Sequence, residues 1–266
     1  MDIHEIVNTV EKNALSIRNI GLLNGRAGVM TLFFCYHSFS NQQKYKDLAF
    51  RYLETMCEEI DDSTSLSYSD GLCGFGTAIE FLLQHHLIAG NGNDILEEID
   101  KQVAAHIIHL PVSDCGLDQG LAGWGRYLFY RIKGVKSDFD SIITLHAKEY
   151  FIQVIDLIDY YREENRHVKE EIISFLIDAY QLNVINFKIE KLLRFFLEIN
   201  DIDSCFKNAL TIKNKCTTMY LNELRKKLNM HYDDSLNTGM RDGYTGMGMT
   251  WLMDNGYIPD DWTNLI

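Results

Sequence analysis

The stretch Gln119–Tyr130, QGLAGWGRYLFY, contains the pattern that decides the fold. A polar residue precedes a glycine, a small residue and a second glycine follow, and an apolar run comes next. The same order occurs in NGRAGVMTLFF (24–34), DGLCGFGTAIEF (70–81) and DGYTGMGMTWLM (242–253). The first glycines of successive copies lie 46, 49 and 123 residues apart. A period near 48 is typical of a repeat architecture, and the long interval has room for degenerate copies within residues 135–238.

The apolar residues between the glycine motifs follow a helical period. Between Gln42 and Ile60 they form one stripe, and residues 139–161, 172–180 and 192–199 show similar spacing. A further helix is predicted from Asp94 to Leu110. No sustained alternation of the kind found in strands occurs, and the chain has only two prolines. We therefore expect an all-α chain of about ten to twelve helices, arranged as a single domain over residues 1–266.

The glycine motifs are expected to begin the second helix of each hairpin. Gly71 and Gly74 are three residues apart, so they share a helix face and let another backbone approach. Polar residues stand directly before the motifs and are predicted to be N-caps, namely Asn24, Asp70 and Asp242. The predicted helix starts lie near Ala27, Cys73, Ala122 and Thr245.

Composition and charge narrow the classes of partner and compartment. The net charge of −13 argues against nucleic acid as the main partner. The N-terminus lacks the pattern of a signal peptide, and no run of 18 apolar residues indicates a membrane span. Six cysteines occur without a CxxC pair, which favours free thiols in the cytoplasm.

The four motifs resemble those of the lanthionine synthetase C-like family. GLAGWGRYLFY (120–130) is most similar, DGLCGFGTAIEFLL (70–83) and DGYTGMGMTWLM come next, and NGRAGVMTLFF is weaker. The resemblance implies an α/α toroid, a double ring of helical hairpins with GxxG motifs at the starts of the inner helices. It covers about residues 22–132 and 238–255, whereas residues 133–237 follow the helical pattern alone.

The resemblance also implies a chemistry. Cyclases of this family add cysteine thiols of a precursor peptide to dehydrated residues, and a zinc ion held by two Cys and one His delivers the thiolate. The ligands stand two residues before, or immediately before, the first glycine of a motif. Here those places hold Leu23, Ser69, Asp118, Arg241, Asn24, Asp70, Gln119 and Asp242. None is Cys or His, so we expect no metal site and no cofactor.

Polar residues at the predicted inner-helix starts are the remaining candidates for a site. If the hairpins close into a ring, these residues meet at one rim. The candidate catalytic residues are Asp70, Asp118, Asp242 and Arg241, and the candidate binding residues are Tyr68, Asp114, Gln119 and Trp124. Carboxylates beside an arginine can act as a general acid and base or hold a basic peptide. Helix capping or packing is the simpler interpretation of each.

A second candidate surface is basic. It contains Lys207, Lys213, Lys215, Arg225, Lys226 and Lys227. Such a run is typical of a solvated helix face, and it can also receive an acidic leader peptide.

Three classes of function stay open at this point. The first is a zinc-free relative of lanthionine cyclases that binds a peptide substrate or a partner modification enzyme. The second is an α/α-toroid carbohydrate-active enzyme that uses a pair of rim carboxylates, and the third is a helical scaffold without a small-molecule site.

Overall fold

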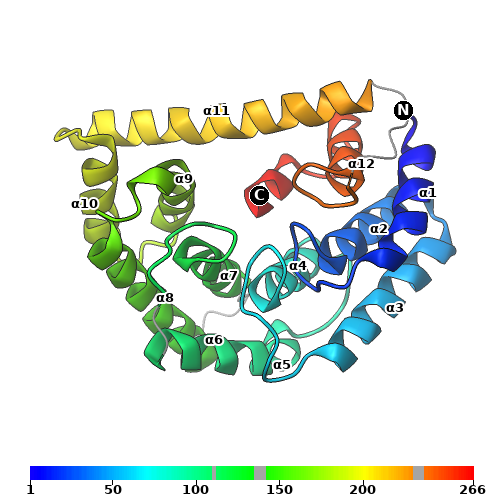
Figure 1. Ribbon diagram of the computed structural model, residues 1–266, viewed down its shortest axis with the longest axis horizontal. Coiled ribbons are helices and arrows are strands. Elements are labelled where there is room, and N and C mark those ends of the chain that lie inside the picture. The colour runs from blue at the N-terminus through cyan, green and yellow to red at the C-terminus, as the bar shows by residue number, and fades with distance from the viewer. Residues whose placement is uncertain (110–111, 135–141, 230–236) are drawn as a thin grey trace. The chain divides into compact units, whose positions relative to one another are not determined.

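The computed structural model describes residues 1–109, 112–134, 142–229 and 237–266 (Figure 1). Within these ranges the chain forms helices and no strand, which confirms the predicted all-α class. The α-helices are α1 (Ile3–Asn13), α2 (Arg26–Ser40), α3 (Gln43–Glu59), α4 (Leu72–Gln84), α5 (Gly92–Ile95), α6 (Glu97–His109), α7 (Leu121–Lys133), α8 (Ile142–Tyr161), α9 (Lys169–Tyr180), α10 (Asn186–Leu197), α11 (Ile202–Leu228) and α12 (Tyr244–Asp254). Short 3-10 helices are η1 (Ala14–Ser16), η2 (Arg166–Val168) and η3 (Asp260–Leu265).

The chain divides into two compact units. Unit 1 comprises residues 1–65, 69–89 and 218–266, and unit 2 comprises residues 66–68 and 90–217. Unit 1 therefore holds α1 to α4, α12 and the last part of α11, whereas unit 2 holds α5 to α10 and the first part of α11. Of the interval expected to hold degenerate repeats, residues 135–141 and 230–236 lie outside the described ranges.

Unit 1 combines fully buried helices with amphipathic ones. The first eleven residues of α2 and of α4 are all buried, and α12 is buried from Tyr244 to Thr250. Helix α3 buries only the stripe of Tyr45, Ala49 and Met56, as the helical period predicts. Helix α2 packs against α3, α4 and α12, and α1 packs against α12 (Figure 1). The helices that begin at glycine motifs are thus the inner ones of this unit.

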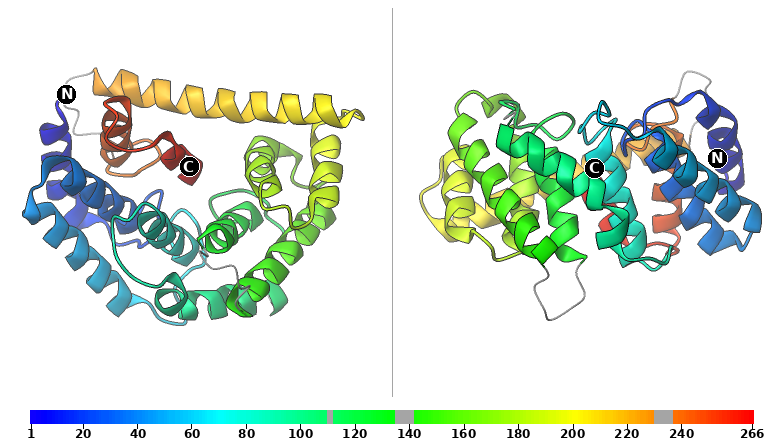
Figure 2. Two further views of the ribbon diagram at one scale, coloured as in Figure 1. Left: turned by 180° about the vertical axis from the view of Figure 1, so that it is seen from behind. Right: turned by 90° about the horizontal axis from the view of Figure 1, so that it is seen from below.

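Unit 2 repeats this division. Helix α7 is buried from Leu121 to Arg131 and packs against α8 and α9. Helix α6 contacts α8, and α10 contacts α8 and α9, as the views in Figure 2 also show. The helix expected from residue 139 is α8, and residues 139–141 lie outside the described ranges.

One predicted helix is interrupted. The sequence pattern predicted a continuous helix from Asp94 to Leu110, whereas the chain forms α5, a bend at Leu96 and then α6, and Leu110 lies outside the described ranges. Leu96 is completely buried, and its N–H donates to the carbonyl of Gly92, which closes α5 after one turn. Asn91 caps α5 through its side chain, so two short helices replace the long one.

Three charged side chains meet in the interior of unit 2. Asp178 of α9 accepts from Arg126 of α7 at 3.3 Å and from Lys213 of α11. The side chains of Arg126 and Asp178 are only 3% and 4% exposed. Burial lowers the pKa of Lys213, although Asp178 opposes that shift. One carboxylate therefore holds two cations at the junction of three helices.

We expect Asp178→Asn to destabilise the protein by about 3–5 kcal/mol, because it removes the carboxylate that the buried Arg126 and the partly buried Lys213 share. Urea unfolding followed by circular dichroism measures the loss. The control is Asp156→Asn, whose carboxylate is 46% exposed and pairs with Lys188, and which should change the free energy of unfolding by less than about 1 kcal/mol. Equal losses in the two variants would contradict the buried role of Asp178.

Candidate functional site

Each glycine motif is preceded by a loop that closes on the start of its own helix. In all four copies the first helical N–H donates to the carbonyl oxygen seven residues earlier. The pairs are Arg26 to Asn19 at 2.9 Å, Leu72 to Ser65 at 2.9 Å, Leu121 to Asp114 at 2.9 Å and Tyr244 to Asn237 at 3.0 Å. We name residues 19–25, 65–71, 114–120 and 237–243 loops 1 to 4. The helices begin within one residue of the predicted starts, which confirms that the motifs mark inner-helix starts.

The predicted N-caps are wrong. The N-cap of each helix is the first glycine of the motif, and none of these caps has a side-chain hydrogen bond. Asn24, Asp70 and Asp242 stand one residue earlier. There are two reasons. A backbone carbonyl of the loop already accepts the first helical N–H, and the loop backbone leaves no room for a side chain at the N-cap position. A Cβ at Gly243 would lie well under 3.0 Å from the carbonyl oxygen of Asn237.

The second glycine of the motif lets the same loop pass close to the helix, because it has no side chain. A Cβ at Gly123 or Gly246 would lie well under 3.0 Å from a carbonyl oxygen six residues earlier, that of Leu117 or Met240. The loop therefore crosses directly over the first turn of its helix. At Gly28, Gly123 and Gly246 the close backbone is therefore that of the preceding loop, and the same expectation for Gly71 and Gly74 stays a prediction.

Loops 1, 2 and 4 are joined to one another in unit 1. Asn24 Nδ2 donates to Ser69 Oγ at 2.6 Å, and Asn19 Nδ2 donates to Asp70 Oδ1 at 3.0 Å. Backbone bonds add to these, because the Leu23 N–H donates to the Ser69 carbonyl at 3.1 Å and the Leu23 carbonyl accepts from Met240 at 2.7 Å. Three inner-helix starts thus meet at one end of unit 1, and closure of a full ring stays a prediction.

Loop 3 lies in an acidic pocket of unit 2. The carbonyl oxygen of Asp118 accepts from the Tyr68 N–H at 2.9 Å. The carboxylates of Asp114 and Glu171 accept from the N–H groups of Gly116 and Leu117, each at 2.7 Å. The pocket has a volume of about 440 Å³ and is lined by Ser113, Asp114, Gly116, Asp118, Glu164, Asn165, His167, Val168 and Glu171.

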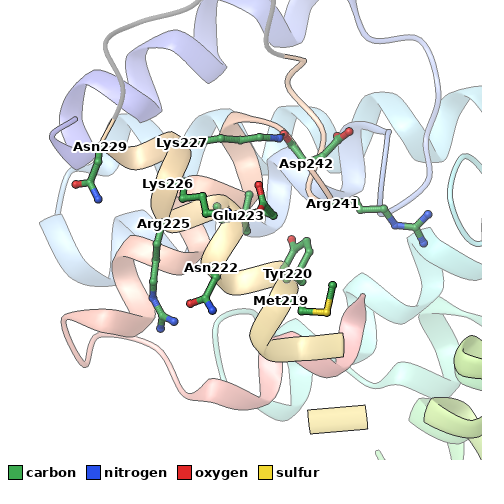
Figure 3. A pocket seen from close by; sticks show the side chains of 11 residues that line it. Met219, Tyr220, Asn222, Glu223, Arg225, Lys226, Lys227, Asn229, Arg241 and Asp242 are labelled. Atoms are coloured by element: carbon green, nitrogen blue, oxygen red, sulfur yellow. Dashed lines mark hydrogen bonds and ion pairs between the residues drawn. The ribbon is translucent and has the colours of Figure 1, made fainter. Parts of the chain in front are cut away.

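A larger open groove runs beside the last turns of α11 in unit 1 (Figure 3). We name it the α11 groove. Its volume is about 770 Å³. Loop 4 contributes Arg241 and Asp242. The rest of the lining comes from α11 and the residue that follows it, namely Met219, Tyr220, Asn222, Glu223, Leu224, Arg225, Lys226, Lys227 and Asn229. The groove therefore joins part of the predicted basic surface to two of the predicted rim residues.

The predicted site residues fall into two groups. Asp70, Arg241 and Asp242 belong to unit 1, and Tyr68, Asp114, Asp118, Gln119 and Trp124 belong to unit 2. The side chains of Tyr68 and Trp124 are in the core, with 0% and 3% exposure. Asp114 and Gln119 are exposed. The binding and catalytic roles of all eight stay predictions.

The positions that the resemblance assigns to zinc ligands do not fit zinc. Leu23 is apolar and buried, and the oxygens of Ser69 and Asp70 accept from asparagines of loop 1. The Asp242 carboxylate accepts from Asn237 Nδ2 at 2.6 Å. No group of three His, Cys, Asp or Glu residues suited to a metal occurs in the described ranges. A site of two thiolates and one imidazole has no counterpart among these donors.

The two cysteines beside the motifs are buried thiols. Cys73 and Cys115 are both 0% exposed. Burial, reinforced by the nearby charges of Asp114 and Glu164, raises the pKa of Cys115 to about 12. Because a metal ligand or nucleophile must be a thiolate, Cys115 is poorly suited to either task near neutral pH.

Sequence reasoning missed the residues that close the loops. Asn19, Ser65 and Asn237 stand six residues before the first glycine of their motifs, as Asp114 does in loop 3. A polar residue at this offset recurs in all four copies, so aligning the copies over a longer window could have revealed it. Glu171 is different, because it comes from α9 and reaches loop 3 only through the tertiary fold.

We expect the Asn24–Ser69 contact to couple loops 1 and 2 energetically. A double-mutant cycle of Asn24→Ala and Ser69→Ala, measured by urea unfolding, should give a coupling energy of about 0.5–1.5 kcal/mol. Asn24→Ala combined with Ser38→Ala, an exposed serine of α2, should be additive. A coupling for Asn24 and Ser69 that is no larger than the control would show that this bond does not hold the loops together.

The comparisons with known proteins bear on the same residues. A search of curated proteins found no match. A family model described as lanthionine synthetase C-like protein matches residues 16–174. This range contains loops 1 to 3, and loop 4 lies beyond it with the same closure and the same two glycines. Since the match covers more than half of the 266 residues, the chain belongs to the lanthionine synthetase C-like family.

Proposed function

We propose that this chain binds a peptide in ribosomal peptide modification and does not carry out zinc-dependent thiol addition. Its peptide partner is a substrate or a segment of a partner modification enzyme. Family membership supports the peptide class. The proposal that the chain works without zinc is supported by the hydrogen bonds of the residues that stand at the positions of the family's zinc ligands.

Those places are occupied by residues that already have partners in the protein. Ser69, Asp70 and Asp242 accept hydrogen bonds from Asn24, Asn19 and Asn237. Hydroxyl, carboxylate and amide oxygens are harder donors than the thiolates of a lanthionine-type zinc site. The loops are thus held by protein hydrogen bonds, and this supports a binding role in place of the cyclase reaction.

The α11 groove supports the peptide-binding role. It is open, and its volume of about 770 Å³ lies within the range of ligand sites in proteins. One wall comes from a glycine-motif loop, the element through which this family builds its sites. The peptide therefore has a place to bind in unit 1 that requires no metal.

The state of the cysteines supports a reducing compartment such as the cytoplasm. All six are free thiols. No helix in the described ranges is long and apolar enough to cross a membrane.

One observation favours a second candidate, a carbohydrate-active enzyme. The acidic pocket gathers Asp114, Asp118, Glu164 and Glu171, and paired carboxylates perform glycoside hydrolysis. However, the carboxylates of Asp114 and Glu171 accept from backbone N–H groups of loop 3. Because these two acids hold the loop, we favour the peptide-binding proposal.

We expect the protein, purified without chelator, to contain no stoichiometric zinc and to leave a dehydrated precursor peptide uncyclised. Elemental analysis measures the metal, and mass spectrometry of thiol-alkylated peptide measures cyclisation. About one zinc per chain, lost in the Cys73→Ser or Cys115→Ser variant, would contradict the proposal and restore the enzyme interpretation.

The peptide-binding part is tested by selection from a displayed library of random peptides against the whole chain. Enrichment of sequences that bind the chain in solution would support it. Failure to enrich any, together with hydrolysis of an oligosaccharide that is lost in the Asp118→Asn variant, would favour the carbohydrate-active alternative.

A further inference from the structure

We infer that the α11 groove receives an acidic segment of the bound peptide, in which carboxylates stand next to apolar side chains. This inference rests on the proposed function and adds the chemistry of the ligand. It follows from three features of the groove, which are its walls, its charges and its apolar surface.

Helix α11 and loop 4 form the two walls and are fastened to each other. Tyr220 Oη donates to the Met240 carbonyl at 2.6 Å, and Lys227 Nζ donates to the Asp242 carbonyl at 2.5 Å. These residues are seven apart on α11, so they share one helix face. Figure 3 shows Lys227 extending from α11 toward Asp242, and Arg241 beside Asp242 on loop 4. The walls are therefore in place before a ligand arrives.

The charges of the groove have the opposite sign to those of the whole chain. Four cations line it, namely Arg225, Lys226, Lys227 and Arg241, against the carboxylates of Glu223 and Asp242. The chain as a whole has a net charge of −13. A basic groove on an acidic protein attracts anionic ligands locally, while the rest of the surface repels long polyanions.

The cations differ in how far they are already neutralised. Arg225 is paired with Asp254 through two bonds of 2.6 and 2.8 Å, and Lys226 pairs with Glu223 at 2.5 Å. Lys227 donates to a carbonyl oxygen, a neutral acceptor. Because this ammonium group has three N–H donors, it can bind a ligand carboxylate without releasing the loop. Lys227 is therefore the principal anchor for a carboxylate.

The apolar surface of the groove explains why the ligand is a peptide with mixed character. Met219 is 58% exposed, which is high for an apolar side chain. Its flexible thioether packs against side chains of varied shape. Burial raises the pKa of Tyr220, so its hydroxyl stays protonated and keeps its bond to loop 4. An acidic segment with apolar neighbours matches both kinds of surface.

The test is fluorescence anisotropy with the full chain and two labelled peptides. One peptide alternates Glu and Leu, and the matched peptide alternates Lys and Leu. We expect the acidic peptide to bind at least about tenfold more tightly, and its affinity to fall as salt rises from about 50 to about 300 mM. The double variant K227E/R241E should weaken binding of the acidic peptide by at least about tenfold.

The matched control is K215E, which adds negative charge on the same helix outside the groove. It should change the affinity by less than about twofold. Circular dichroism and the urea midpoint check the fold, and K227Q/R241Q replaces the double variant if charge reversal prevents folding. Unchanged affinity in the folded double variant, equal binding of the two peptides, or tighter binding of a single-stranded oligonucleotide would each overturn the inference.

The selection experiment separates this inference from the proposed function. If library peptides bind equally well to the wild type and to the folded K227E/R241E variant, the proposed function stands and the acidic-peptide inference fails. If selected peptides are rich in Asp and Glu and lose affinity in the variant, both are supported.

Discussion

The rest of the structure depends on one backbone hydrogen bond that recurs four times. It joins the first N–H of an inner helix to the carbonyl oxygen seven residues earlier. The bond is possible because the N-cap and the residue three positions later are glycines, which let the loop lie directly against the first turn. In this way the helix start is satisfied without a capping side chain. The polar side chains around it are then available for contacts between loops.

Those side chains explain why membership of the lanthionine synthetase C-like family does not by itself fix the chemistry. The fold needs the glycines and the loop closure, and both are present in all four copies. A zinc site needs a further set of soft donors at two offsets before the glycine. Here the corresponding residues of unit 1, including Asn24, Ser69 and Asp70, bond with neighbouring loops. The scaffold is therefore held by contacts that need no metal ligand at these positions.

Much of the fold and less of the site could be predicted from the sequence. The glycine period and the apolar stripe of α3 are local patterns, so they gave the helical class and the helix starts within one residue. The predicted capping role of Asp70 was wrong. The first N–H of α4 donates to the backbone carbonyl of Ser65, which reaches it only when loop 2 is folded. The burial of Trp124 agrees with the packing interpretation of that residue. The reach of Glu171 to loop 3 depends on a contact between α9 and the loop, which a helical period does not reveal.

The measurement that tests the loop closure most directly is the free energy of unfolding of Gly246→Ala, compared with Gly256→Ala. A Cβ at Gly246 would lie well under 3.0 Å from the Met240 carbonyl oxygen, whereas Gly256, with φ of +75°, has nothing within 4 Å. We expect a loss of about 2–3 kcal/mol or more for Gly246→Ala, and only about 1 kcal/mol of backbone strain for Gly256→Ala. A Gly246→Ala variant as stable as the wild type, or no less stable than Gly256→Ala, would contradict the claim that the glycine motif exists to close the loop.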